Sequence, residues 1–133
     1  MERLRVLLVD DVADMRKFIK NALQRTFIDC DVDEASDGID ARTHMETLQY
    51  DLVLCDWGLP GLTGEDLLKW VRDDEKHREV PFIIITGYRD RERVLRAMEF
   101  GVTDYIVKPI SIDTLIKKVR EANKNFSGKK AKS

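Results

Sequence analysis

The sequence predicts an α/β fold in which a doubly wound, five-stranded parallel sheet carries helices on both faces. Five short apolar runs alternate with segments whose apolar residues recur at helical spacing, and this alternation is typical of parallel sheets covered by helices. The run over 51–56 is apolar at almost every position, as expected for a strand that is buried on both faces. A length of 133 residues is also usual for one domain with one core.

The first half of the chain contains two predicted units of a strand followed by a helix. The first strand covers Leu4–Val9 and the second lies around 32–35, and a segment of helical periodicity follows each of them. Asp14 is the predicted N-cap of the first helix, and the Asp37-Gly38 pair marks the turn into the second. The apolar residues that indicate these helices are Met15, Phe18, Ile19, Ala22 and Leu23, then Ile39, Ala41, Met45 and Leu48.

The second half continues the alternation from a predicted central strand, Asp51–Asp56. The loop after it contains Gly58, Pro60, Gly61 and Gly64, and its spacing matches neither a dinucleotide-binding loop nor a P-loop. The later elements are a third helix, a strand over 82–85, a helix over 90–100 that ends at Gly101, a strand over 104–107 and a last helix capped by Ser111. The residues predicted to face inward are Leu67, Leu68 and Val71 in the third helix, and Leu115, Ile116, Val119 and Ala122 in the last.

Composition restricts the class of protein. Hydrophobic residues make up 43% of the chain and charged residues 36%, and no apolar run approaches the roughly 20 residues that cross a bilayer. With no signal peptide at the start, the chain is predicted to be soluble and cytoplasmic. A net charge of −2 argues against direct binding of nucleic acid. Residues 1–126 form the predicted domain, and 127–133 form a short, basic, disordered tail.

The cysteines and histidines are predicted to have structural roles rather than roles in disulfide bonding or metal binding. Cys30 and Cys55 are too few for a disulfide framework, and the position of Cys55 inside an apolar strand predicts a buried, inert thiol. His44 and His77 have no second histidine or cysteine at metal-binding spacing, so both are predicted to lie at the surface. Trp70 is predicted to be a partly buried packing residue.

Polar residues follow four of the predicted strands at the points where these strands end. They are Asp10 and Asp11 after the first strand, Asp56 at the end of the third, Thr86 after the fourth and Lys108 after the last. Because the carboxyl ends of parallel strands meet at one edge of a sheet, these side chains are expected to lie together. Clustered carboxylates repel one another unless a cation lies between them, and Mg²⁺ prefers such oxygens. We therefore predict a magnesium site with Asp11 and Asp56 as direct ligands and Asp10 acting through a water.

Asp56 is the predicted nucleophile of this site. It ends the central strand and precedes a loop, so its carboxylate is held rigidly and can still be reached. Carboxylates attack phosphorus to form acyl phosphates, and this chemistry depends on in-line positioning and charge neutralisation. Mg²⁺ and Lys108 would supply positive charge, and the Thr86 hydroxyl would donate a hydrogen bond to a phosphoryl oxygen.

Three other interpretations use the same residues. A pair of aspartates at a strand-to-helix junction is also consistent with a purely capping role. The string from Asp10 to Asp14 matches the DDxxD pattern of prenyl-diphosphate enzymes, but those enzymes need a large helical cavity that a short α/β chain does not provide. A magnesium-dependent phosphatase with an aspartyl nucleophile usually has a D-x-D motif, whereas Trp57 and Gly58 follow Asp56.

The chain resembles the receiver domains of two-component response regulators, in particular the single-domain chemotaxis type. The resemblance covers about Leu4 to Asn125 and rests on five motifs. They are Asp10-Asp11, Met15-Arg16-Lys17, Asp56-Trp57-Gly58-Leu59-Pro60, Thr86-Gly87 and Tyr105-Ile106-Val107-Lys108-Pro109. The resemblance implies the flavodoxin-like strand order 2-1-3-4-5, which places the three aspartates at the switch point between the first and third strands.

At the acidic site, the resemblance implies a phosphoacceptor that assists its own phosphorylation and dephosphorylation and is not otherwise an enzyme. Asp56 would accept a phosphoryl group from a histidine kinase or phosphotransfer domain. Mg²⁺ would be held by Asp11, Asp56 and the backbone carbonyl of Gly58. Lys108 would pair with the phosphoryl group, and the Lys108–Pro109 peptide bond would be cis.

Away from that site, the resemblance implies a phosphorylation-activated switch. Thr86 and Tyr105 would couple the phosphoryl group to the face made by the helix over 90–100, the strand over 104–107 and the last helix (helix 4, strand 5 and helix 5 of the family), which would regulate a downstream protein. The basic residues of this face are either a solvated surface or a site for an acidic partner; they are Arg89, Arg91, Arg93, Arg96, Lys117, Lys118 and Arg120. Two alternatives keep the fold, namely a receiver cut from a longer regulator and a phosphorelay shuttle.

Gly58 and Tyr88 depart from the usual chemotaxis pattern at positions where receivers differ in phosphoryl lifetime. Gly58 has no side chain to place a water, and Tyr88 is bulky where many receivers carry an acid. We hypothesise that both tune dephosphorylation, with Tyr88 covering the in-line path. Tyr88→Ala should therefore change the rate at which labelled phosphate is lost, and an unchanged rate would contradict the hypothesis.

Overall fold

The computed structural model describes residues 3–87 and 91–123, which form a five-stranded sheet and five helices. The strands are β1 (Leu4–Val9), β2 (Cys30–Ala35), β3 (Leu52–Asp56), β4 (Phe82–Thr86) and β5 (Asp104–Val107). The helices are α1 (Ala13–Thr26), α2 (Gly38–Thr47), α3 (Gly64–Asp73), α4 (Arg91–Glu99) and α5 (Ile112–Ala122). The strand order is β2-β1-β3-β4-β5 and every neighbouring pair is parallel, which confirms the predicted fold.

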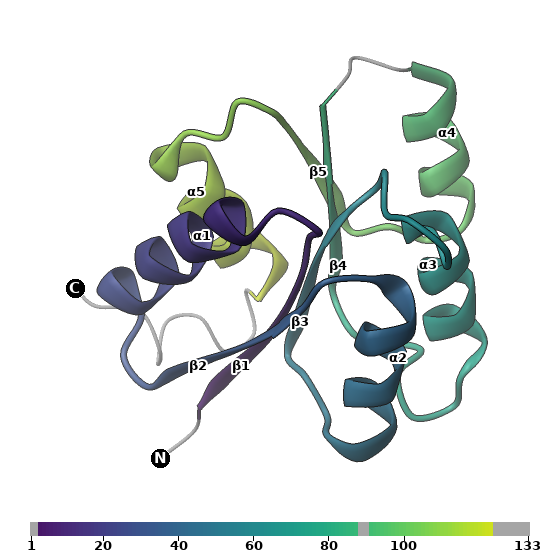
Figure 1. Ribbon diagram of the computed structural model, residues 1–133, viewed down its shortest axis with the longest axis horizontal. Helices are drawn as coiled ribbons and strands as arrows, with labels where there is room; N and C mark the ends of the chain where they lie inside the picture. Colours follow the sequence, from purple (N-terminus) through teal and green to yellow (C-terminus); the bar gives the residue numbers. More distant parts are fainter. Residues whose placement is uncertain (1–2, 88–90, 124–133) are drawn as a thin grey trace.

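The helices form a layer on each face of the sheet (Figure 1). α1 and α5 cover one face, and α2, α3 and α4 cover the other. This division follows from the position of β1 inside the sheet, because the chain passes from β1 to β2 on one side and then returns to β3 on the other. Within the described part of the chain, no helix combines the length and apolar content needed to cross a membrane.

The inner strands divide their side chains between two buried clusters, because successive residues of a strand point to opposite faces. In β1, Val6 and Leu8 join the cluster that contains residues of α1 and α5, whereas Leu7 and Val9 join the cluster that contains residues of α2, α3 and α4. Every residue of β3 is buried. β3 is also the middle strand of the sheet, as predicted.

β2 is an edge strand and has a different composition from the inner strands. Its buried residues are Val32 and Ala35, and carboxylates occupy three of its other positions. Each carboxylate accepts a hydrogen bond from a residue outside the strand: Asp31 from Arg3 at 3.0 Å, Asp33 from Tyr50 at 2.6 Å and Glu34 from Arg16 at 3.0 Å. These ionic and polar contacts add to the main-chain pairing of this strand with β1.

The predicted start of the first helix is wrong. α1 begins at Ala13, its N-cap residue Val12 makes no side-chain cap hydrogen bond, and Asp14 lies in the first helical turn. A carboxylate in that turn still interacts favourably with the helix dipole, so aspartate is frequent at both positions and the signal is ambiguous. β2 also begins earlier than predicted, because Cys30 already pairs with Leu4.

The other predicted helix boundaries agree better with the structure. The Asp37 side chain caps α2 by accepting from the Asp40 amide, and Ser111 caps α5 by accepting from the Thr114 amide. Gly101 follows α4 with a φ of +84°, a conformation that glycine adopts without strain. At the start of α3, Thr63 and Asp66 form a capping box that the sequence interpretation missed.

His77 is buried, contrary to its predicted surface position. Its Nδ1 lies 2.5 Å from Asp74 Oδ2, and its ring centroid lies 5.6 Å from that of Trp70. Trp70 packs partly buried against the core, as predicted, and His44 is half-buried. Cys55 is buried, also as predicted, and burial raises the pKa of its thiol well above the ordinary value, which keeps it in the unreactive protonated form.

Two glycines allow helices to start directly against the loop that follows β3. A Cβ added at Gly64 would lie 2.9 Å from the Asp56 carbonyl oxygen and 3.0 Å from Trp57 Cα. A Cβ added at Gly38 would overlap the carbonyl oxygen of Leu62. The starts of α2 and α3 are therefore packed against the backbone that carries Asp56.

We predict that Gly64→Ala lowers the free energy of unfolding by about 1–3 kcal/mol, because the added methyl group meets backbone that cannot move freely. The result would oppose helix propensity, which favours alanine by about 1 kcal/mol. Urea unfolding measures the change. Gly87→Ala is the matched control, since a Cβ there meets nothing within 4 Å, and its effect should be smaller. A Gly64→Ala protein as stable as the wild type would contradict the prediction.

Candidate functional site

The carboxyl ends of β1 and β3 lie side by side at one edge of the sheet. Val9 pairs with Cys55, so Asp10 and Asp56 occupy the next positions of two neighbouring strands. The chain then leaves β1 for α1 and β3 for α3, and these helices cover opposite faces (Figure 1). This divergence is the switch point of the fold, where open α/β sheets bind their ligands.

Three carboxylates gather at this switch point. Asp10, Asp11 and Asp56 each offer an oxygen, and these oxygens lie within 4.8 Å of one another. Asp10 is fully buried, Asp56 is nearly so, and Asp11 is exposed. Such a group of hard oxygen ligands, closed on one side and open to solvent on the other, is suited to a hydrated divalent cation.

Asp10 is the most deeply buried carboxylate of the cluster. Its Oδ1 accepts a hydrogen bond from the Val12 amide at 2.8 Å, but its buried Oδ2 has no hydrogen-bond partner among the described residues. Burial raises the pKa of this carboxyl, and the negative charges of Asp56 and Asp11 raise it further. The Val12 hydrogen bond and the charge of Lys108 act in the opposite direction without cancelling the increase.

Lys108 supplies positive charge from the far end of the sequence. Its Nζ lies 3.6 Å from Asp56 Oδ2 and 4.0 Å from Asp10 Oδ2. Its amide donates to the Thr86 carbonyl at 2.8 Å, which fixes the start of the loop after β5 against the end of β4. The Lys108–Pro109 peptide bond is cis, as the resemblance implied. One ammonium group against three carboxylates leaves the cluster negatively charged.

The backbone at Asp56 is fixed by the sheet, and open space lies beside its carboxylate. Its neighbour Trp57 donates its amide to the Ile85 carbonyl at 2.9 Å, which extends the pairing with β4 beyond the strand end. Asp56 Oδ1 accepts a long hydrogen bond from the Gly58 amide, 3.4 Å. Gly58 is exposed, and a side chain there would meet nothing within 4 Å, so the loop leaves open space beside the carboxylate.

Thr86 and Tyr105 lie on adjacent strands. Ile84 pairs with Tyr105 and Thr86 pairs with Val107, so Thr86 and Tyr105 belong to the same face of the sheet. Thr86 is buried at the end of β4, whereas the Tyr105 side chain is 38% exposed. Lys118 of α5 places its Nζ 5.1 Å from the centre of the tyrosine ring and also bonds to Asp104 at 2.8 Å.

The structure thus brings Asp10, Asp11, Asp56 and Lys108 into one site, with Thr86 at the end of the strand next to Asp56. Tyr88, together with Arg89 and the predicted tail 127–133, lies outside the described residues.

Arg16 is a contact of the site that the sequence interpretation did not assign. It belongs to the Met15-Arg16-Lys17 motif, yet no role followed from its residue type. In the structure its guanidinium donates to the main-chain carbonyl of Asp10 at 2.6 Å. A bond to a backbone oxygen leaves no signal in the identity of the partner residue, so spacing alone does not reveal it.

Sequence comparison identifies relatives along most of the chain. Residues 6–120 match the response regulator receiver domain family. Chemotaxis protein CheY-3 of Vibrio cholerae is 37% identical over 118 residues, which cover 89% of this chain and 90% of that protein. Chemotaxis protein CheY of Pseudomonas aeruginosa is 34% identical over 125 residues, covering 94% of this chain and 100% of that protein.

Solved structures give the same result. The chemotaxis response regulator CheY4 of Vibrio cholerae superposes with a TM-score of 0.84 at 26% identity, covering 91% of this chain and 99% of that chain. The receiver domain of the Francisella response regulator 1452 has a TM-score of 0.81 at 32% identity, covering 92% and 98%. The chain therefore belongs to the response regulator receiver domain family, as a receiver of the CheY type.

Proposed function

We propose that this receiver is a signalling switch that accepts a phosphoryl group on Asp56 from the phosphohistidine of a histidine kinase or phosphotransfer domain. The observation that carries the proposal is the meeting of Asp10, Asp11 and Lys108 around the buried end of β3. Receiver domains are signalling proteins rather than classical enzymes, and this arrangement has a nucleophile, Asp56, with the ammonium group of Lys108 beside it.

The proposed reaction moves one phosphoryl group between two side chains. A carboxylate oxygen of Asp56 attacks the phosphorus, the bond between phosphorus and the histidine nitrogen breaks, and an acyl phosphate forms. The electron pair of that bond stays on the imidazole, which takes up a proton. Lys108, already 3.6 Å from Asp56, would pair with a phosphoryl oxygen, and the Thr86 hydroxyl would donate a hydrogen bond to another.

The donor set fits Mg²⁺. The cluster contains three carboxylates, and one buried oxygen, Asp10 Oδ2, has no hydrogen-bond partner among the residues described. We propose that Asp11, Asp56 and the Gly58 carbonyl hold the ion directly and that Asp10 acts through a water. When bound, Mg²⁺ supplies the positive charge that the phosphoryl oxygens and the carboxylates both need.

The output surface of the proposed switch is the face of α4, β5 and α5. Its exposed apolar residues are Leu95 and Met98 of α4, Tyr105 of β5 and Ile112 of α5. Lys117, Lys118 and Arg120 add positive charge on α5. Phosphorylation would draw Thr86 toward the acyl phosphate and let the Tyr105 ring move inward, which would change this face for a downstream protein with an acidic surface. The names of the relatives favour a chemotaxis role.

Phosphate incorporation tests the acceptor. Wild-type protein incubated with labelled acetyl phosphate and Mg²⁺ should gain label that hydroxylamine removes, as expected for an acyl phosphate, and Asp56→Asn should gain none, because an amide oxygen is a poor nucleophile. Asp31→Asn is the control, since the side chain of Asp31 in β2 is partly exposed and pairs with Arg3. Hydroxylamine-sensitive label on Asp56→Asn would remove Asp56 as the acceptor.

We predict that Asp10→Asn raises the free energy of unfolding of the metal-free protein at neutral pH. Burial raises the pKa of Asp10 in the folded state, so between the unfolded and folded pKa the folded state holds more protons and stability falls as pH rises. At a pH above the folded-state pKa, Asp10 is charged in the folded protein and the full cost of burying that charge lowers stability. Asparagine has no charge, so the Asp10→Asn protein does not bear this cost. Below roughly pH 3 the aspartate is protonated in both states and the gain should vanish.

Urea unfolding in EDTA at neutral and acid pH measures this difference. Asp11→Asn is the matched control, because the Asp11 side chain is exposed and its removal should stabilise less. Adding Mg²⁺ should stabilise the wild type more than Asp10→Asn. A stability gain for Asp10→Asn that is equal at both pH values would contradict the assignment to the buried charge.

A further inference from the structure

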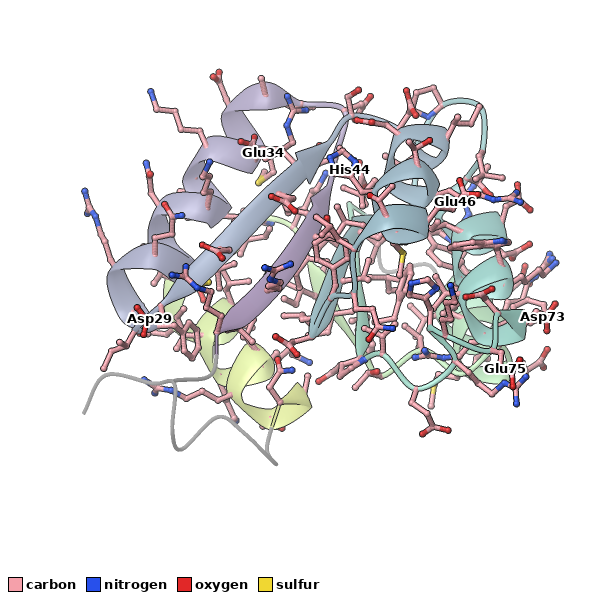
Figure 2. All side chains as sticks on the ribbon, turned by 90° about the horizontal axis from the view of Figure 1, so that it is seen from below. Asp29, Glu34, His44, Glu46, Asp73 and Glu75 are labelled. Atoms are coloured by element: carbon pink, nitrogen blue, oxygen red, sulfur yellow. The ribbon has the colours of Figure 1, made fainter. Side chains whose placement is uncertain are left out.

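Arg16 connects the site to the edge strand β2. Its guanidinium donates to the Asp10 carbonyl at 2.6 Å through Nη1 and to Glu34 Oε1 at 3.0 Å through Nε. Glu34 projects from β2 on the side where α1 passes (Figure 2). The arginine side chain is only 17% exposed, so solvent screens these two contacts less than those of a surface ion pair.

The Asp10 carbonyl, to which Arg16 donates, lies between the end of β1 and the start of α1. The last pair of β1 and β2 is Val9 with Ala35, and the Asp10 amide donates to Ala35 at 3.1 Å. α1 starts three residues after Asp10, and its N-cap residue, Val12, supplies no side-chain hydrogen bond. The Asp10 carbonyl therefore lies between a strand and a helix, and the Arg16 contact is the side-chain bond that holds it.

We propose that Arg16 is a positioning residue of the magnesium site. Its guanidinium, itself held by Glu34, fixes the peptide between Asp10 and Asp11 and so orients both carboxylates toward Asp56. This inference rests on the proposed function, because it takes these carboxylates as the groups that hold Mg²⁺. Removing a group that hydrogen-bonds to a metal ligand and orients it typically lowers metal affinity by about 10–100-fold.

Simple electrostatics predicts the opposite effect. A guanidinium beside a cation site repels the cation, so removing it should strengthen Mg²⁺ binding. Glu34 pairs with Arg16 at 3.0 Å and compensates part of this charge, but the same carboxylate also lies 3.5 Å from the Lys20 ammonium. The two roles therefore predict changes of opposite sign: Mg²⁺ binding weakens without Arg16 if positioning dominates, as we propose, and becomes tighter if repulsion dominates.

A Mg²⁺ titration followed by Trp57 fluorescence measures that sign. Trp57 adjoins Asp56, and a Trp70→Phe background makes it the single tryptophan, since the chain has two. In this background Arg16→Gln should weaken Mg²⁺ binding by about tenfold. Lys20→Gln is the matched control, because Lys20 has the same charge on the same helix and bonds to Glu34 rather than to Asp10. The affinity of Lys20→Gln for Mg²⁺ should equal that of the Trp70→Phe background or be slightly higher.

Arg16→Lys gives a second test if Arg16→Gln folds poorly. Lysine keeps the charge, but its single ammonium group cannot reproduce the two hydrogen bonds that the planar guanidinium makes to Glu34 and to the Asp10 carbonyl. Mg²⁺ binding should therefore again be weaker than in the wild type. Wild-type affinity in both Arg16 variants, or equal weakening in Lys20→Gln, would overturn the role of Arg16. Absence of any Mg²⁺ binding by the wild-type protein would overturn the magnesium site itself, and this inference with it.

Discussion

The pairing of β1 with β3 is the constraint on which the rest of the structure depends. It sets Val9 opposite Cys55 and so carries the carboxylates of Asp10 and Asp56 to adjacent strand ends. A shift of one residue would turn every buried side chain of β1 to the wrong face of the sheet, so the register is strongly specified. The hydrophobic core therefore holds together acidic groups that would separate if they were free to move.

The site opposes the stability of the fold that forms it. A carboxyl as buried as Asp10 favours its neutral form, and neighbouring negative charges add to that preference. Lys108 offsets part of this repulsion from the end of β5, and its own position depends on the hydrogen bond to the Thr86 carbonyl. The negative charge that remains would attract a cation to the site. A cation bound there, as we propose, would offset the negative charge that the surrounding residues leave uncompensated.

The fold and the four charged site residues could be predicted from the sequence because each depends on a short-range signal. An apolar run followed by a polar residue marks a strand end, and parallel topology brings the ends together. The start of α1 at Ala13 was missed because aspartate is frequent both at the N-cap and in the first turn. The burial of His77 and the Arg16 contact with Asp10 were missed because they are decided by which groups meet in space. A sequence window shows the residue but not the backbone oxygen, ring or carboxylate that it meets.

The acidic residues of β2 have a consequence beyond the contacts they make. An edge strand presents unpaired main-chain groups, to which a second chain can add as a further strand. Asp31, Asp33 and Glu34 place negative charges along this edge, so a copy approaching in register would bring like charges opposite one another. The strand that holds Arg16 through Glu34 would thus also disfavour edge-to-edge pairing of two copies, so that Glu34 would serve both the proposed site geometry and the resistance to self-association.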